Sequence, residues 1–230
     1  MLSWLERADA FPPVEKALKD PNGLLCAGGD LSESRLLDAY RHGIFPWYSG
    51  EEPILWWSPD PRMVLYCGEL KVSRSLAKSM RNRGYRVRID TVFEQVLAGC
   101  SGPRKGESGT WLGQGMRKAY LALHRAGHAH SFETWHRDDL VGGLYGVALG
   151  RMFYGESMFS LATDASKVAL VELVHELGTR GLPLIDCQMR TPLLASLGGR
   201  EIPRRAFLRA LAALVNYAEP PGKWSRVATQ

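Results

Sequence analysis

Hydrophobic and polar positions follow two periods along the chain after residue 62. Period-two stretches predict strands at 63–66, 85–89, 129–135, 140–149, 152–159 and 184–188. Apolar positions three and four residues apart predict helices at 73–82, 91–98, 115–125, 166–177 and 204–217. Because these strands and helices are interleaved, the pattern predicts a mixed α/β or α+β sheet domain over 63–230.

Residues 1–62 lack this pattern and are rich in turn-forming residues. Their prolines are Pro12, Pro13, Pro21, Pro46, Pro53, Pro59 and Pro61. One short helix is predicted, with its apolar face within 36–40 and a cap at Asp30 or Ser32. Such a stretch buries little surface alone, so we expect a small N-terminal domain, 1–62, that packs on the larger one.

Composition narrows the class of protein. The 230 residues are 45% hydrophobic and 23% charged, which is typical of a globular chain. The longest uninterrupted apolar run is 210–215, too short to span a bilayer, and the acidic and basic residues near the N-terminus do not fit a secretory signal. The four cysteines form no C-x-x-C pair. We therefore expect a cytoplasmic protein with no membrane partner.

Positive charge is concentrated in one segment. The net charge is only +5, yet residues 71–88 hold seven Lys and Arg residues and no acid. Arg74, Lys78 and Arg81 fall on one face of the predicted helix. A solvated helix face and a contact with a phosphate backbone explain this spacing about equally well.

Common catalytic motifs are absent from the sequence. It has no Walker A loop, no G-x-G-x-x-G after a strand and no G-x-S-x-G elbow. His128 and His130 share a strand face, but no third metal ligand stands at a spacing typical of a metal site. The turn 161–166 has no glycine to hold a pyrophosphate. We expect neither a metal nor a cofactor.

Two acidic residues stand in otherwise apolar strands. Asp186 lies in 182–188, where alternation places it on the same face as Gln188, and Glu156 lies in 155–160. A carboxylate in such a place is costly unless it is paired or hydrogen-bonded. Both a structural explanation (a turn-holding Asp, an edge-strand Glu) and a catalytic one stay open.

Ten blocks in order resemble the leucyl/phenylalanyl-tRNA–protein transferase family. They are PNGLLCAGGDL at 21–31, HGIFPWYS at 42–49, PILWWSPDPR at 53–62, GTW at 109–111, AYLALHRAGHAHSFETW at 119–135, LVGGLYGVALGRMFYGESMFS at 140–160, DASKVAL at 164–170, LIDCQ at 184–188, ASLGG at 195–199 and EIPRRAFL at 201–208. No block is decisive alone, but their order and spacing make coincidence untenable.

The resemblance implies a small N-terminal domain on a C-terminal domain with the N-acetyltransferase-like (GNAT-like) fold. It implies an enzyme that moves Leu or Phe, and also Met, from tRNA to the α-amino group of proteins that begin with Arg or Lys. That product enters the N-degron route of degradation. The aminoacyl ester is already activated, so the reaction requires neither ATP nor a metal. We expect a monomer.

The resemblance also implies roles for particular residues. The catalytic group comprises Asp186, Gln188 and Glu156, where Asp186 is either a proton acceptor or an orienting group. Trp47 and Trp111 match positions that stack on the terminal adenosine. The pocket for the aminoacyl side chain is formed by Leu144, Phe153, Leu170, Leu173 and Ile185. The contacts with the tRNA backbone come from Arg74, Lys78, Arg81 and Arg83.

Some positions depart from the family pattern. Leu193 stands where many relatives have His, Leu161 replaces a frequent Arg, and Gly113 replaces a frequent Thr that can cap a helix. Alternation also places Ile185 and Asp186 on opposite faces of a flat strand, so a twist or bulge must bring both near a ligand.

Two other functions are compatible with parts of the sequence. One is an aminoacyl-tRNA-dependent transferase that branches cell-wall precursors. The other is a non-catalytic tRNA-binding module that uses only the basic helix, against which the two strand acids argue.

Overall fold

Two sheets form the frame of the molecule in the computed structural model, which describes residues 2–49, 52–102, 112–217, 222–224 and 226–227. The four-stranded sheet has the order β1 (Ser3–Leu5), β2 (Leu24–Gly28), β4 (Leu55–Trp57), β3 (Phe45–Pro46). The eight-stranded sheet has the order β11 (Arg200–Ile202), β5 (Arg62–Tyr66), β10 (Leu184–Gln188), β9 (Met152–Ser160), β8 (Asp139–Leu149), β7 (Ala129–His136), β6 (Tyr85–Ile89), β12 (Arg226–Val227). The fold is therefore mixed α/β, as predicted.

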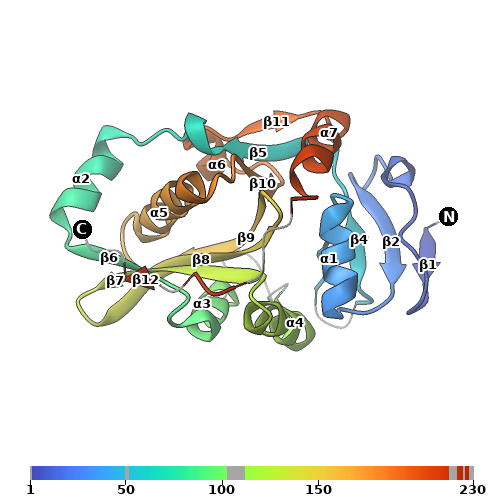
Figure 1. The fold of residues 1–230 in the computed structure, drawn as a ribbon, viewed down its shortest axis with the longest axis horizontal. Helices are drawn as coiled ribbons and strands as arrows, with labels where there is room; N and C mark the ends of the chain where they lie inside the picture. Colours follow the sequence, from blue (N-terminus) through green and yellow to red (C-terminus); the bar gives the residue numbers. More distant parts are fainter. Residues whose placement is uncertain (1, 50–51, 103–111, 218–221, 225, 228–230) are drawn as a thin grey trace.

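Helices cover both faces of the eight-stranded sheet (Figure 1). The helices of the described residues are α1 (Glu33–Arg41), α2 (Arg74–Asn82), α3 (Phe93–Cys100), α4 (Gln114–Arg125), α5 (Ala165–Arg180), α6 (Pro192–Ser196) and α7 (Arg204–Leu214), with short 3₁₀ turns at Val14–Lys16 and Cys67–Glu69. Helix α5 packs on one face with Leu144 and Phe153, and α3 and α4 pack on the other with Tyr145 and Tyr154. This division follows from the alternation of side chains along β8 and β9.

The predicted elements of 63–217 are confirmed, with ends that differ by a few residues. The strands of the N-terminal sheet were not predicted, nor were β11, β12 and α6. Strand β3 has two residues and β4 has three, which is too short to show a period of two. The predicted N-terminal helix is α1, and of its two candidate caps it is Ser32 that accepts from the backbone N–H of Arg35.

One hydrophobic cluster joins the two sheets. It contains Leu36 and Tyr40 of α1, Trp56 of β4, and Tyr145 and Phe207 from the larger part of the chain. The N-terminal segment therefore buries its apolar side chains against the larger sheet, as its composition predicts.

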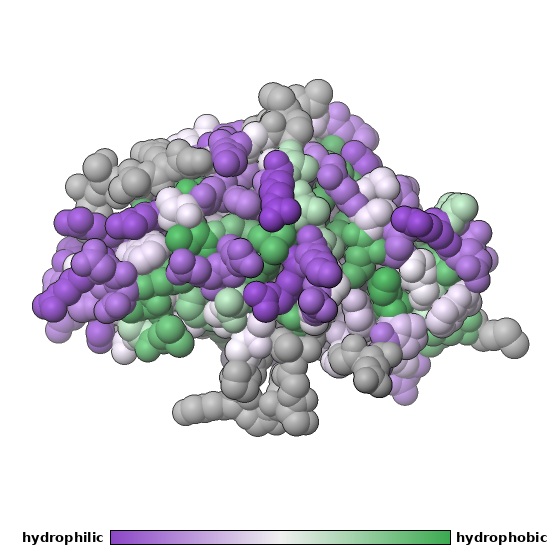
Figure 2. Space-filling view, turned by 90° about the horizontal axis from the view of Figure 1, so that it is seen from below, coloured by the Kyte–Doolittle hydropathy of each residue, from purple (hydrophilic) through white to green (hydrophobic). Residues whose placement is uncertain are grey.

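Hydrophilic side chains crowd the end of the molecule where the β7–β8 hairpin turns (Figure 2).

Strands β9 and β10 separate partway along their length, and this separation positions the site. They pair in parallel up to Tyr154 and Asp186, and their pairing ends there. Beside this point the register of β9 against β8 shifts, because Ser157 pairs with Tyr145 and Gly155 with Gly146, which leaves Glu156 of β9 as the extra residue. A Cβ atom at Gly146 would lie 2.2 Å from the carbonyl oxygen of Tyr154, so only glycine fits there.

No helix among the described residues is long and apolar enough to cross a membrane.

The start of α3 is held by a carboxylate from the sheet. Val92, the residue before the helix, provides no side-chain cap. Glu133 of β7 is buried and accepts from the Thr91 N–H at 3.0 Å, the Thr91 hydroxyl at 2.6 Å and the Ser131 hydroxyl at 2.6 Å. Burial raises the pKa of Glu133, although these donors oppose the rise. The side chain thus replaces a missing local cap.

We predict that Glu133→Ala lowers the free energy of unfolding by about 2–4 kcal/mol, because it leaves buried donors without an acceptor. Urea denaturation measures this loss. Glu94→Ala, an exposed Glu→Ala change in the first turn of the same helix, is the control and should cost less than about 1 kcal/mol. Equal losses in the two variants would contradict the capping role.

Candidate active site

A cavity of about 360 Å³ lies where β9 and β10 diverge. Segments far apart in the sequence form its walls: Phe45, Pro46 and Trp47, then Leu144 and Tyr145, Gly155–Met158, Leu170 and Leu173, Ile185, Cys187, Gln188 and Met189, and Thr191, Leu193 and Leu194. The cavity has one apolar side and one side with polar groups.

The apolar side of the cavity contains most of the residues assigned to an aminoacyl pocket. Leu144, Leu170, Leu173 and Ile185 line the cavity, but Phe153 does not. Phe153 pairs with Ile185 in the closed part of the sheet, and its ring packs 6.1 Å from that of Trp224. Met158, which was not predicted, lines the cavity, and its position two residues after Glu156 on one strand was a usable signal.

Glu156 is the carboxylate that lines this cavity. Its Oε1 accepts from the Tyr40 hydroxyl at 2.7 Å, and its Oε2 accepts from the Tyr120 hydroxyl at 2.6 Å. The Gln188 side-chain amide donates to Oε1 at 3.3 Å. Burial, aided by the nearby Asp186, raises the pKa of Glu156 from 4.5 to about 7, although the three donors oppose the rise. Glu156 can therefore exchange a proton near neutral pH.

The two tyrosines were missed by the sequence analysis. Tyr40 belongs to α1 and Tyr120 to α4, and their hydroxyls lie 3.1 Å apart. Burial and the charge of Glu156 raise both tyrosine pKa values well above the usual range, so both stay protonated as donors. Two helices far from Glu156 in the sequence therefore donate to one carboxylate. No local sequence pattern reveals such a contact.

Asp186 is fully buried and does not line the cavity. It forms a bidentate ion pair with Arg62, whose Nε donates to Oδ1 at 2.8 Å and whose Nη2 donates to Oδ2 at 2.6 Å. Arg62 is also fully buried and was given no role by the sequence analysis. The charge of Asp186 is therefore compensated inside the protein.

A bulge, of the kind that the sequence analysis required, follows Asp186. The register of β10 against β5 shifts between Asp186 and Gln188, and Gln188 has a φ of 63°. The backbone N–H of Gln188 donates to Oδ1 of Asp186 at 2.9 Å. The bulge brings Ile185 and Gln188, but not Asp186, into the cavity. The expectation that Asp186 and Gln188 share a flat strand face is thus corrected.

Trp47 lies at the cavity rim with 39% of its surface exposed. Trp57 fixes it, because the Trp57 indole N–H donates to the Trp47 carbonyl at 2.6 Å and the two rings meet edge to face at 5.4 Å. An exposed indole in this position has a face for stacking. Trp111 lies outside the described residues.

The predicted basic helix is α2. Ser73 caps it by accepting from the Leu76 N–H, and Leu76 is buried against the body of the molecule. The four residues predicted to contact phosphates are all exposed: Arg74, Lys78, Arg81 and Arg83. None of them makes an ion pair with another described residue. The charges of Arg74, Lys78 and Arg81 are thus available to an external anion, whereas Arg83 also interacts electrostatically with Asp164.

The histidine pair lies at a second cavity, of about 250 Å³, which shares no lining residue with the first. His130 bonds through Nδ1 to Asp90 at 2.8 Å and stacks on Trp224. Within the described part of the chain no group of three His, Cys, Asp or Glu side chains could hold a metal ion. The arrangement explains His130 as a packed and hydrogen-bonded residue.

Comparison with known proteins defines the class of this site. A family model described as "Leucyl/phenylalanyl-tRNA protein transferase" matches residues 64–212, and the model of its N-terminal domain matches 29–60. A leucyl/phenylalanyl-tRNA–protein transferase of Thiobacillus denitrificans is 62% identical over 95% of this chain and 96% of the relative. One of Chromobacterium violaceum is 56% identical over 97% of this chain and 96% of the relative.

The protein is thus an aminoacyltransferase. The chain belongs to the leucyl/phenylalanyl-tRNA–protein transferase family. Among solved structures, L-PGS from Bacillus licheniformis is similar with a TM-score of 0.42 and 13% identity, over 69% of this chain and 52% of that chain. A likeness of that size carries no argument about fold or function.

We predict that Glu156 makes stability fall as pH rises through about 7. Its pKa is higher in the folded protein than the 4.5 of an exposed Glu, so the folded state binds the extra proton, and this stabilisation is lost above about pH 7. Glu156→Gln stays neutral at every pH. Its free energy of unfolding should therefore rise by up to about 3 kcal/mol relative to that of the parent protein as the pH is raised from 4.5 to 8. Urea denaturation at both pH values measures the difference, with exposed Glu15→Gln as the control. A difference that does not change with pH would refute the raised pKa.

Proposed function

We propose that this protein transfers Leu or Phe, and also Met, from aminoacyl-tRNA to the α-amino group of proteins that begin with Arg or Lys. The observation that carries the proposal is a proton-exchanging carboxylate, Glu156, on the wall of a cavity whose other side is apolar. The apolar side suits a Leu or Phe side chain. The carboxylate suits a cationic amine that must lose a proton before it attacks.

The proposed chemistry assigns one role to each polar group of the cavity. Glu156 attracts the acceptor ammonium and takes its proton, and the free amine then attacks the ester carbonyl. The Gln188 amide already donates one hydrogen to Glu156, and its second hydrogen is placed to stabilise the oxyanion. As the ester C–O bond breaks, the proton on Glu156 passes to the leaving 3′ oxygen of the tRNA. The extra proton on the nitrogen of the new amide is then taken up by Glu156 and released to solvent. Tyr40 and Tyr120 hold Glu156 in place throughout.

Two sets of residues are proposed to contact the tRNA, one at its terminal adenosine and one at its acceptor stem. Trp47 at the rim stacks on the terminal adenosine, a contact worth about 1–3 kcal/mol per base. Trp111 is proposed for the same role by resemblance. The exposed Arg74, Lys78 and Arg81 on α2, together with Arg83, contact the phosphates of the acceptor stem.

We also propose a domain organisation, an oligomeric state and a cellular role for the protein. We infer a GNAT-like C-terminal domain over 63–230 because β9 and β10 diverge beside a bulge in β9, and a small N-terminal domain over 1–62. The protein acts as a monomer in the cytoplasm and needs no cofactor or metal. Its products enter the N-degron route.

We predict ATP-independent transfer of labelled Leu from Leu-tRNA to a peptide that begins with Arg, and none to the same peptide with an acetylated N-terminus. A muropeptide acceptor tests the cell-wall alternative in the same assay. Glu156→Gln should lower kcat by about 10²–10⁴-fold, the usual contribution of a general base. Glu94→Gln is the matched control. Tight tRNA binding without transfer by the parent protein would favour the non-catalytic alternative.

We predict that Arg74→Gln combined with Lys78→Gln weakens tRNA binding and lowers the salt slope of log K by about two, close to one for each phosphate that is no longer neutralised. Filter binding of aminoacyl-tRNA over a range of salt concentrations measures both. The matched control is Arg205→Gln with Arg209→Gln, an exposed pair at the same spacing on α7. Equal effects of the two pairs would remove α2 from the proposed interface.

A further inference from the structure

We propose that Arg62 is a positioning residue of the transfer reaction, acting through Asp186 to set the conformation of Gln188. This inference rests on the proposed function, in which Gln188 contacts the reacting ester. It assigns to Asp186 an orienting role in place of a proton-accepting one.

Arg62 is locked in place on every side. Its guanidinium carbon lies 4.8 Å from the centroid of the Phe45 ring and 4.7 Å from that of Phe207. Its Nη1 donates to the Gly43 carbonyl at 3.1 Å, and its Nε and Nη2 donate to Asp186. A planar guanidinium between rings, with a bidentate carboxylate at its edge, has little freedom to rotate. Lysine cannot reproduce this geometry.

Asp186 has no unoccupied carboxylate oxygen for a substrate proton. Oδ1 accepts from the Nε of Arg62 and from the backbone N–H of Gln188, and Oδ2 accepts from the Nη2 of Arg62. Asp186 is also fully buried and lies outside the cavity lining. Both oxygens already accept from the Arg62 guanidinium, so protonation of Asp186 would weaken its charged hydrogen bonds to Arg62. The carboxylate that the cavity exposes is Glu156.

The hydrogen bond from Gln188 explains how the Arg62–Asp186 pair acts at a distance. Gln188 has a φ of 63°, a left-handed conformation that few non-glycine residues adopt and that costs energy. The Oδ1 of Asp186 holds the Gln188 N–H in that conformation. The side-chain amide of Gln188 then reaches Glu156. If Asp186 rotates, Gln188 is free to return to an ordinary strand conformation and leave the cavity.

The same pair connects the N-terminal segment to the site. Gly43 follows α1 and has a φ of 70°, and a Cβ atom there would lie 2.9 Å from the Leu208 side chain. Phe45 both lines the cavity and contacts the Arg62 guanidinium. The chain after α1, the Arg62–Asp186 pair and α7 therefore form one packed unit, with Gln188 at its end.

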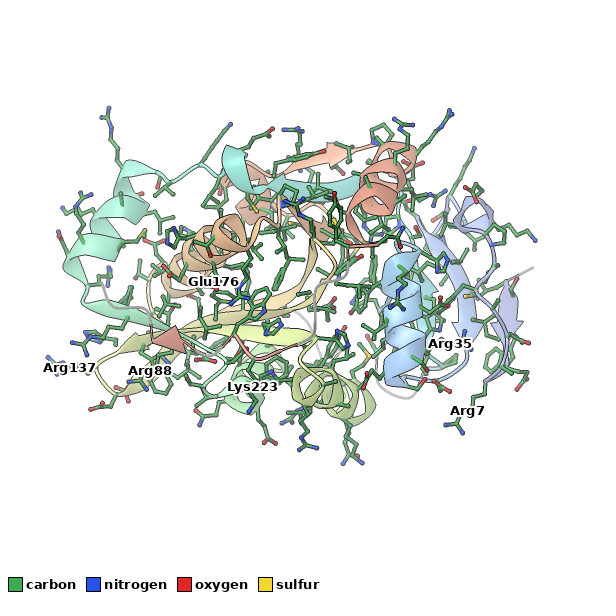
Figure 3. All side chains as sticks on the ribbon, in the orientation of Figure 1. Arg7, Arg35, Arg88, Arg137, Glu176 and Lys223 are labelled. Carbon is green, nitrogen blue, oxygen red and sulfur yellow. The ribbon has the colours of Figure 1, made fainter. Side chains whose placement is uncertain are left out.

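The experiment compares the parent protein with Arg62→Lys, Asp186→Asn, and Arg62→Met combined with Asp186→Leu. The control is Arg35→Lys, a second buried arginine that bonds two backbone carbonyls and lies over a Phe ring, but on the side of α1 that faces the N-terminal sheet (Figure 3). Thermal unfolding, tRNA affinity and the pH profile of single-turnover Leu transfer are measured for each variant.

We expect Arg62→Lys to lower the transfer rate at least tenfold while tRNA affinity and acceptor KM change less than threefold. Arg35→Lys should lower the melting temperature but keep the transfer rate within twofold. The apolar double variant should regain stability, because it removes both buried charges together, yet remain as slow as Arg62→Lys. In Arg62→Ala, guanidinium ion at a concentration that leaves the protein folded should restore part of the rate.

The pH profile separates an orienting from a proton-accepting Asp186. The acidic limb should be retained in Asp186→Asn and Arg62→Lys and vanish only in Glu156→Gln. In Asp186→Asn it should move to lower pH, because the charge of Asp186 helps to raise the pKa of Glu156. Loss of that limb in Asp186→Asn would overturn the proposal, as would an unchanged rate in folded Arg62→Lys. A parent protein that transfers no amino acid would instead refute the proposed function, so the two failures are distinguishable.

Discussion

The buried ion pair between Arg62 and Asp186 is the interaction on which the site depends. Breaking one partner would leave an uncompensated charge in the interior, which is far more costly than the pair is favourable. The pair is therefore an energetic constraint more than a source of stability. It fixes where β5 and β10 meet, holds the bulge that carries Gln188, and ties the chain after α1 to α7. A fold that retains this pair has one way to arrange the cavity.

The two strand carboxylates illustrate how environment divides similar groups between different tasks. Asp186 faces a fixed cation and keeps its charge satisfied inside the protein. Glu156 has only neutral donors, Tyr40, Tyr120 and Gln188, so burial is not fully offset and its pKa rises to about 7. A group near neutral pKa can accept and release a proton, whereas a group locked to arginine can only orient its neighbours. The proposed mechanism accordingly uses Glu156 as the proton-exchanging carboxylate and Asp186 as the orienting one.

The sequence predicted the elements and residues whose evidence is local. The strands 85–89 and 184–188 show their period directly, whereas the two residues of β3 cannot. Strand β2 also has five residues but was missed, because four of them in succession are buried and its sequence shows no alternation. The position of Glu156 in an apolar strand was visible, but its donors were not, because Tyr40 is 116 residues away. Arg62 likewise has no local signal, since its partner is 124 residues along the chain. Phe153 lies outside the cavity lining because it pairs with Ile185 before the two strands diverge, and a residue pattern cannot show where that divergence begins.

The distribution of charge also follows from the task of joining two unlike substrates. A tRNA is a polyanion and attracts cations over a wide area, whereas a protein N-terminus is a single cation that must be admitted to one point. The exposed cations of α2 serve the first need only if no nearby acid neutralises them, and no ion pair among the described residues does so. Glu156 serves the second need only if the cavity contains no competing cation, and Arg62 is occupied by Asp186 outside its lining. A net charge of only +5 is therefore compatible with strong local fields of both signs.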